Sequence, residues 1–133
     1  MTEIVHKELS YKITGLLFST HKELGRFRNE KQYADYFENL LKKNEIKYFR
    51  EYGINEEKID NKKIRCVIDF LIDDKIVLEF KVVSFLTKED YYQIQRYLSS
   101  LGLHLGILVN FRQYRLAPKR ILNSDFLHKK RPS

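Results

Sequence analysis

The chain has 133 residues, of which 43% are hydrophobic, 14% aromatic and 32% charged. This length fits one domain, and this composition is typical of a globular protein with a packed core. We therefore expect a single domain over residues 1–133, ending in a basic, loosely held tail from about residue 119.

Charge and cysteine content narrow the classes of function. The net charge of +7 favours a polyanionic partner such as nucleic acid, although part of the excess lies in the tail, which could be only a solvated end. Cys66 is the only cysteine, so a disulfide framework is excluded and a reducing, cytoplasmic location is predicted. Charged residues occur throughout the N-terminal segment, and we expect neither a signal peptide nor a membrane partner.

Two helices are predicted at the start of the chain. Apolar residues at three- and four-residue steps predict a helix over 7–24, which Gly25 ends. Asn29, with Gln32 three residues later, predicts a capping box that begins a second helix, ending near Asn44. The apolar residues that this second helix should bury are Tyr33, Phe37, Leu40 and Leu41.

The sequence then changes to short apolar runs. Residues 46–54, 64–72 and 76–83 are predicted strands of a meander, and residues 105–111 a fourth strand. Between the last two lies a third helix, begun by Thr87 and Asp90 and ended by Gly102. A strand, helix, strand crossover is most simply parallel and right-handed. The predicted fold is therefore α/β, an α+β mixed sheet of order α-α-β-β-β-α-β.

Charged residues interrupt the apolar sequence of the second and third strands. Because side chains alternate along a strand, Cys66, Ile68, Phe70 and Ile72 should share one face and Asp69 the other. If the hairpin turns through residues 73–75, Asp69 lies directly opposite Glu79. Lys81 then follows one step along the same face.

Two carboxylates at this separation require a positive partner. A divalent cation satisfies the requirement, since Mg²⁺ prefers oxygen ligands, but Lys81 could instead neutralise one carboxylate in an inert ion-pair cluster. Glu30 and Gln93, the latter one turn before Tyr97, could point into the same cleft. Equally, Glu30 could be a favourable charge at a helix N-terminus, and Gln93 and Tyr97 part of a solvated helix face.

Other chemistries lack support. The four histidines have no paired ligand spacing and one cysteine supplies no zinc ligand set, so no zinc site is predicted. There is also no glycine-rich phosphate loop and no nucleophile elbow.

These residues resemble the GxxExxY proteins, a branch of the PD-(D/E)XK nuclease superfamily. The segments that carry the resemblance are 13–15, 21–25, 30–33, 68–70, 78–81, 93–97 and 106–111. Phe27 stands where the first glycine of the family's name motif would be, which leaves the conformation of that loop open. Glu30 and Tyr33 of the same motif are retained.

The resemblance implies a restriction-endonuclease-like core and a magnesium-dependent nuclease, with Mn²⁺ as a substitute metal. Asp69, Glu79 and the main-chain carbonyl of Phe80 would bind the metal, and Glu30 could add a further carboxylate. Lys81 would orient or activate water, because a nearby ammonium group can position that water and balance charge.

By the same resemblance, Gln93 would orient a ligand or the substrate phosphate, with Tyr97 and Tyr33 as supporting residues. The expected partner is nucleic acid, in the first place DNA, and a homodimer is an open alternative to a monomer. Two other functions stay open from the residues alone. One is a catalytically silent nucleic-acid-binding or regulatory module that keeps the nuclease fold, and the other is a structural role for an ion-pair network.

Overall fold

The computed structural model describes residues 4–59 and 62–125. Within these residues the chain forms three helices and five strands. In chain order they are α1 (Lys7–Leu24), α2 (Glu30–Lys43), β1 (Tyr48–Ile59), β2 (Lys62–Ile72), β3 (Ile76–Lys81), α3 (Lys88–Leu101), β4 (Leu105–Asn110) and β5 (Lys119–Leu122).

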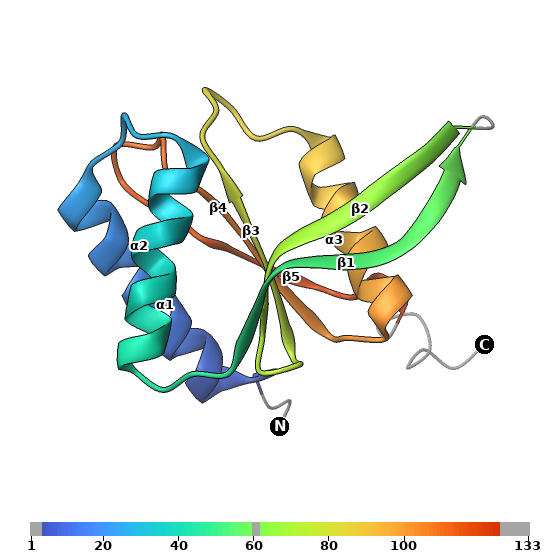
Figure 1. Ribbon diagram of the computed structural model, residues 1–133, viewed down its shortest axis with the longest axis horizontal. Helices are drawn as coiled ribbons and strands as arrows, with labels where there is room; N and C mark the ends of the chain where they lie inside the picture. Colours follow the sequence, from blue (N-terminus) through green and yellow to red (C-terminus); the bar gives the residue numbers. More distant parts are fainter. Residues whose placement is uncertain (1–3, 60–61, 126–133) are drawn as a thin grey trace.

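The strands form one mixed sheet in the order β1-β2-β3-β4-β5. All neighbouring strands are antiparallel except β3 and β4, which are adjacent and parallel and are joined along the chain by α3. This confirms the predicted mixed α+β fold. The helices α1 and α2 cover one face of the sheet and α3 the other (Figure 1).

Helix ends follow the predicted capping residues. Gly25 is the C-cap of α1 with a positive φ of 75°, and Asn29 and Gln32 form the capping box of α2. Thr87 and Asp90 form the corresponding box of α3. Leu40 differs from expectation: it is half-buried, while Tyr33, Phe37 and Leu41 of the same helix are buried. No helix in 4–59 or 62–125 is long and apolar enough to cross a membrane.

The C-terminal part of the chain departs from the prediction. Lys119–Leu122 is a strand that pairs antiparallel with β4, so the expectation of a loosely held tail from about residue 119 is wrong for this segment. Ile121 is buried against the α3 side of the sheet, and the Asn123 main-chain N–H donates to the His104 carbonyl at 2.9 Å. The rest of the predicted tail, 126–133, lies outside the described residues.

The predicted faces of β2 are correct at one end of the strand and wrong at the other. Phe70 and Ile72 lie in the core beneath α1 and α2, whereas Ile68 lies in the core beneath α3 and Cys66 packs against it. The paired positions of β2 and β3 run from Ile72 to Phe70, and beyond them the long β1–β2 ribbon bends away from β3 and over α3 (Figure 1). Because of this bend, the side chains predicted to share one face of β2 contact the α1–α2 core at one end of the strand and the α3 core at the other.

Candidate active site

The candidate site lies where β2 and β3 separate. Phe70 pairs with Leu78 as predicted, and beyond that pair two carboxyl groups bridge the strands. The Asp69 main-chain N–H donates to Glu79 Oε1 at 2.9 Å, and the Phe80 N–H donates to Asp69 Oδ2 at 2.8 Å. The alternation of side chains thus correctly predicted that Asp69 and Glu79 lie next to each other. The structure adds that their carboxyl groups accept the main-chain N–H groups that would otherwise pair between the two strands.

The Glu79 carboxyl group is buried and that of Asp69 is half-buried. Glu79 is 4% exposed, and burial, then the charge of Asp69, raises its pKa well above the ordinary value. Burial also raises the pKa of Asp69, against the opposing effect of the Phe80 N–H. Two acidic groups held this close, one of them buried, favour a state in which one proton stays on the pair. A cation at this point would replace that proton.

Lys81 ends β3 on the side of α3. Its Nζ lies 3.8 Å from Asp90 Oδ1, in the first turn of that helix. Its charge also favours ionisation of Glu30, Asp69 and Glu79, since it lowers the pKa of each against the dominant effect of burial. Lys81 is therefore close enough to balance the carboxylates, and Asp90 is a partner that sequence reasoning did not identify.

A cavity of about 210 Å³ opens beside Asp69. It is large enough for several water molecules, each of which occupies roughly 30 Å³ in the liquid. Its lining residues are Glu30, Lys31, Ala34, Arg50, Glu51, Asp69 and Phe80. Burial, then the charge of Asp69, raises the pKa of Glu30. The structure thus brings Glu30 and Asp69 to one cavity from α2 and β2.

The expected supporting residues have different surroundings. Gln93 is half-buried on α3 and is not among the residues lining this cavity. Tyr97 is buried, not on a solvated face, and its hydroxyl donates to the Val67 carbonyl at 3.5 Å. Burial, then the charge of Glu79, raises the pKa of Tyr97. Tyr33 donates to the Gly25 carbonyl at 2.5 Å and stacks on Phe111, so it supports the α1–α2 loop.

Glu51 is a carboxylate that sequence reasoning missed. It lies on β1 between Arg50, paired with Phe70, and Tyr52, paired with Ile68, and so opposite Asp69. Its φ of 54° is in the left-handed region, which is unfavourable for a residue other than glycine. Its charge contributes to the raised pKa of Asp69. The only sequence signal was an Arg-Glu pair inside a predicted strand.

The donor set suits a divalent metal that prefers oxygen ligands. Among residues 4–59 and 62–125, no cluster of three or more histidine, cysteine, aspartate or glutamate side chains could hold a metal ion. Mg²⁺ in phosphate-processing sites commonly takes only one or two carboxylates, with waters and substrate phosphate completing its shell. Asp69, which lines the cavity with room for water, and the adjacent Glu79, which does not line it, would supply two such carboxylates.

Comparison with known proteins identifies a nuclease fold. The profile described as PD-(D/E)XK nuclease superfamily matches residues 7–121. The crystal structure of SSO0001 is similar over 84% of this chain and 65% of that chain, with 22% sequence identity and a TM-score of 0.53. This chain therefore spans just under two thirds of that protein, and the likeness concerns the fold alone.

A second solved structure is an alkaline exonuclease, LHK-Exo, from Laribacter hongkongensis. Its TM-score is 0.49 at 14% identity, covering 98% of this chain and 76% of that chain. No curated protein matches this chain.

Proposed function

Because the chain belongs to the PD-(D/E)XK nuclease superfamily, we propose that it is a magnesium-dependent nuclease hydrolysing phosphodiester bonds in DNA. The observation that carries the proposal is the adjacent carboxyl pair of half-buried Asp69 and buried Glu79 at the splayed end of β2 and β3. Burying two acidic groups side by side is unfavourable unless a proton or cation lies between them. A structural hairpin has no need of such an arrangement.

Asp69, Glu79 and the main-chain carbonyl of Phe80 would hold Mg²⁺, with Glu30 as a further ligand from α2. When bound, the metal supplies a Lewis acid that polarises the phosphoryl oxygen and lowers the pKa of water. Mn²⁺, which also accepts oxygen ligands, would substitute for it.

The chain's own groups would then serve hydrolysis in distinct ways. Lys81 would orient the attacking water and balance the negative charge that develops on the phosphate. The new P–O bond forms as the bond to the leaving oxygen breaks; the attacking water gives one proton to solvent, and solvent gives one proton to the leaving oxygen. Gln93 would orient a ligand or phosphate, and Tyr97 would hold the α3 side of the site through its contact with Val67.

A catalytically silent nucleic-acid-binding module is the second candidate. Its supporting observation is the ion pair of Lys81 with Asp90, which gives the ammonium group a partner outside the carboxyl pair. The net charge of +7 would attract nucleic acid with or without cleavage. We further propose that the chain belongs to the GxxExxY branch and that, with a single cysteine, it works in a reducing compartment such as the cytoplasm.

Cleavage assays separate the two candidates. End-labelled single-stranded DNA, duplex DNA and RNA are incubated with wild type in Mg²⁺, in Mn²⁺ or in EDTA. Cleavage only with divalent metal, lost in Asp69→Asn and Lys81→Ala but kept in Lys75→Ala, supports the nuclease. Lys75 is a matched control because it is an exposed lysine in the β2–β3 turn, paired with Asp73. Salt-sensitive binding without cleavage would support the silent module instead.

A further inference from the structure

Three loops meet at the end of the molecule where β3 and β4 finish. They are residues 25–29 between α1 and α2, 82–87 between β3 and α3, and 111–118 between β4 and β5. All three lie along the upper edge of the ribbon in Figure 1. Lys81, at the end of β3, places the candidate active site at this same edge.

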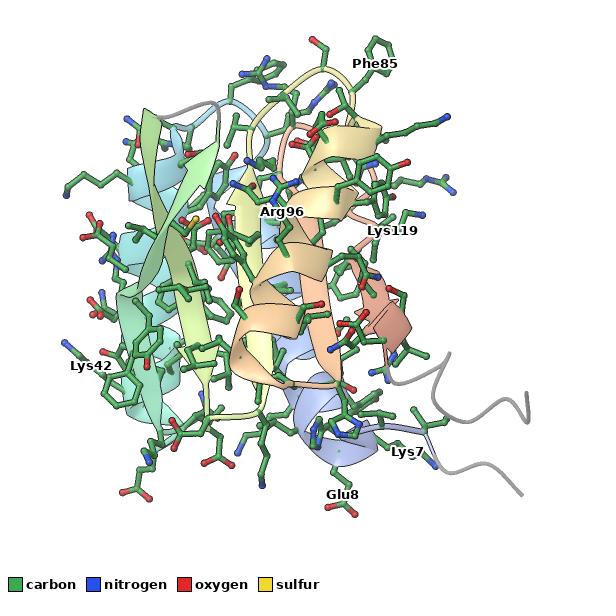
Figure 2. All side chains as sticks on the ribbon, turned by 90° about the vertical axis from the view of Figure 1, so that its right-hand side faces the viewer. Lys7, Glu8, Lys42, Phe85, Arg96 and Lys119 are labelled. Carbon is green, nitrogen blue, oxygen red and sulfur yellow. The ribbon has the colours of Figure 1, made fainter. Side chains whose placement is uncertain are left out.

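Each of these loops exposes one aromatic ring. Phe27 is 77% exposed, Phe85 is 83% exposed and Tyr114 is 79% exposed. Figure 2 shows Phe85 projecting from the top of its loop, away from the body of the protein. Rings left in water lose the free energy that burial would give them, so three on one edge indicate a surface that is covered by a partner.

Cationic side chains surround Phe27. The Arg26 guanidinium carbon lies 4.9 Å from the ring centroid and that of Arg112 lies 5.7 Å from it. Arg28 and Lys31 are exposed beside them. A ring among cations is the combination that binds single-stranded nucleic acid, because bases stack on rings and phosphates pair with the cations.

Hydrogen bonds hold the loops in place before any partner binds. Arg26 Nε donates to the Arg112 carbonyl at 2.8 Å, joining the first loop to the third. The buried Asn110 side chain joins β4 to the second loop, since its Nδ2 donates to the Val83 carbonyl at 2.8 Å and its Oδ1 accepts the Val83 N–H at 3.1 Å. A preformed surface loses less conformational entropy when it binds.

Two further observations connect this surface to a ligand and to the site. Buried Arg112 Nε has no hydrogen-bond partner among the described residues, so a phosphate that drew this guanidinium group outward would break no internal bond at that nitrogen.

A groove of about 690 Å³ runs beside Phe27, and Glu30 and Lys31 line both this groove and the cavity at Asp69. Nucleic acid in the groove would therefore lead to the candidate metal ligands.

We propose that Phe27, Phe85 and Tyr114, with the surrounding arginines, form a stacking surface for unpaired nucleotides next to the scissile phosphate. The inference rests on the proposed function and narrows its substrate to single strands or to duplexes with unpaired ends. Inside a duplex both faces of each base are already stacked, so only the terminal base pairs of a blunt duplex leave a face free for the exposed rings.

The sequence contains no tryptophan, so a Phe27→Trp variant carries a single fluorescent probe. Single-stranded DNA and a blunt duplex of the same sequence are titrated into it in EDTA, which prevents cleavage. We expect saturable quenching by the single strand. Tyr11→Trp is the control: Tyr11 is equally exposed but lies near the opposite end of α1, roughly 20 Å from Gly25 at 1.5 Å per residue. Its fluorescence should not change.

Affinities of the alanine variants complete the test. Phe27→Ala should weaken single-strand binding about 5- to 150-fold, the range for loss of one stacked base, while Phe27→Tyr and Tyr11→Ala bind as wild type. Unchanged binding by Phe27→Ala, equal losses for single strand and duplex, or no binding by wild type would overturn the inference. Wild-type cleavage is measured separately. Cleavage without dependence on Phe27 refutes the stacking surface alone, whereas Phe27-dependent binding without cleavage refutes the nuclease alone.

Discussion

Asp69 and Glu79 take the place of a backbone pair at the end of the β2–β3 ladder: the Asp69 N–H donates to the Glu79 carboxyl group, and the Asp69 carboxyl group accepts the next N–H of β3. Each acidic side chain thus helps to fix the position of the other. The arrangement keeps two carboxyl groups adjacent before any metal binds, with that of Glu79 buried and that of Asp69 half-buried. This preorganisation has a cost in stability that can be measured.

Replacing Glu79 by glutamine should stabilise the metal-free protein at neutral pH. Burial raises the folded-state pKa of Glu79 above its ordinary value of 4.5. The stabilising contribution of its protonated form is therefore fully present below pH 4.5 and is lost as the pH rises through the folded pKa. In Glu79→Gln this loss is removed. Thermal unfolding in EDTA from pH 4.5 to 8 should show a smaller fall in Tm for Glu79→Gln than for wild type. Exposed Glu23→Gln should behave as wild type, and parallel curves for all three proteins would contradict the prediction.

The left-handed backbone at Glu51 can be tested with two substitutions that should have different effects on stability, one to glycine and one to valine. Glu51→Gly should raise stability by about 1 kcal/mol or leave it unchanged, because glycine adopts a positive φ without steric cost but is more flexible when unfolded. Glu51→Val should lower stability by about 1–3 kcal/mol, since a branched side chain is strained there. Urea unfolding measures both. A valine variant as stable as the glycine variant would show that β1 does not adopt this conformation in solution.

Because α3 packs closely on β4, we expect that any side chain larger than that of glycine at position 106 lowers stability. A Cβ added there would lie 2.5 Å from Ile94 Cγ2, so Gly106→Ala must displace the helix or the Ile94 side chain. We expect a loss of about 1–3 kcal/mol in the free energy of unfolding. Gly53→Ala is the control, because a Cβ at that exposed position meets nothing within 4 Å. Equal stabilities of the two variants would contradict the packing.

Asn110 should control the β3–α3 loop. Its buried side chain accepts the Val83 and Arg112 N–H groups and donates to the Val83 carbonyl, so Asn110→Ala leaves several polar groups without a partner. The expected loss is about 1–3 kcal/mol. Hydrogen exchange should show faster exchange at the Val83 amide in this variant, whereas Asn110→Asp, which keeps the acceptor oxygen, should protect that amide better. An unchanged exchange rate of the Val83 amide in Asn110→Ala would show that the Asn110 side chain does not hold this loop.

Local patterns account for most of what the sequence predicted correctly. Asn29 with Gln32, and Thr87 with Asp90, specify helix starts within four residues, and alternation with a short turn sets Phe70 opposite Leu78. These interactions depend on neighbours in sequence, so no tertiary information was needed. The pairing of Asp69 with Glu79 follows from the same local register.

Features that depend on distant contacts were missed. The strand Lys119–Leu122 has only Ile121 buried and owes its conformation to pairing with β4, which its charged sequence does not suggest. The change of face at Ile68 follows from the bend of the β1–β2 ribbon, and the role of Glu51 depends on its position opposite Asp69. Neither can be obtained from strand alternation alone.

The most direct test of the metal site is calorimetric titration of Mg²⁺ and Mn²⁺ into wild type and an Asp69→Ala/Glu79→Ala variant whose fold has been checked by circular dichroism. The titrations are made with and without a non-cleavable phosphorothioate oligonucleotide, because substrate phosphate completes the shell of Mg²⁺. We expect binding by wild type, strengthened by the oligonucleotide, and loss of that binding in the variant. No binding by wild type with the oligonucleotide present, or equal binding by both proteins, would contradict the assignment of Asp69 and Glu79 as metal ligands.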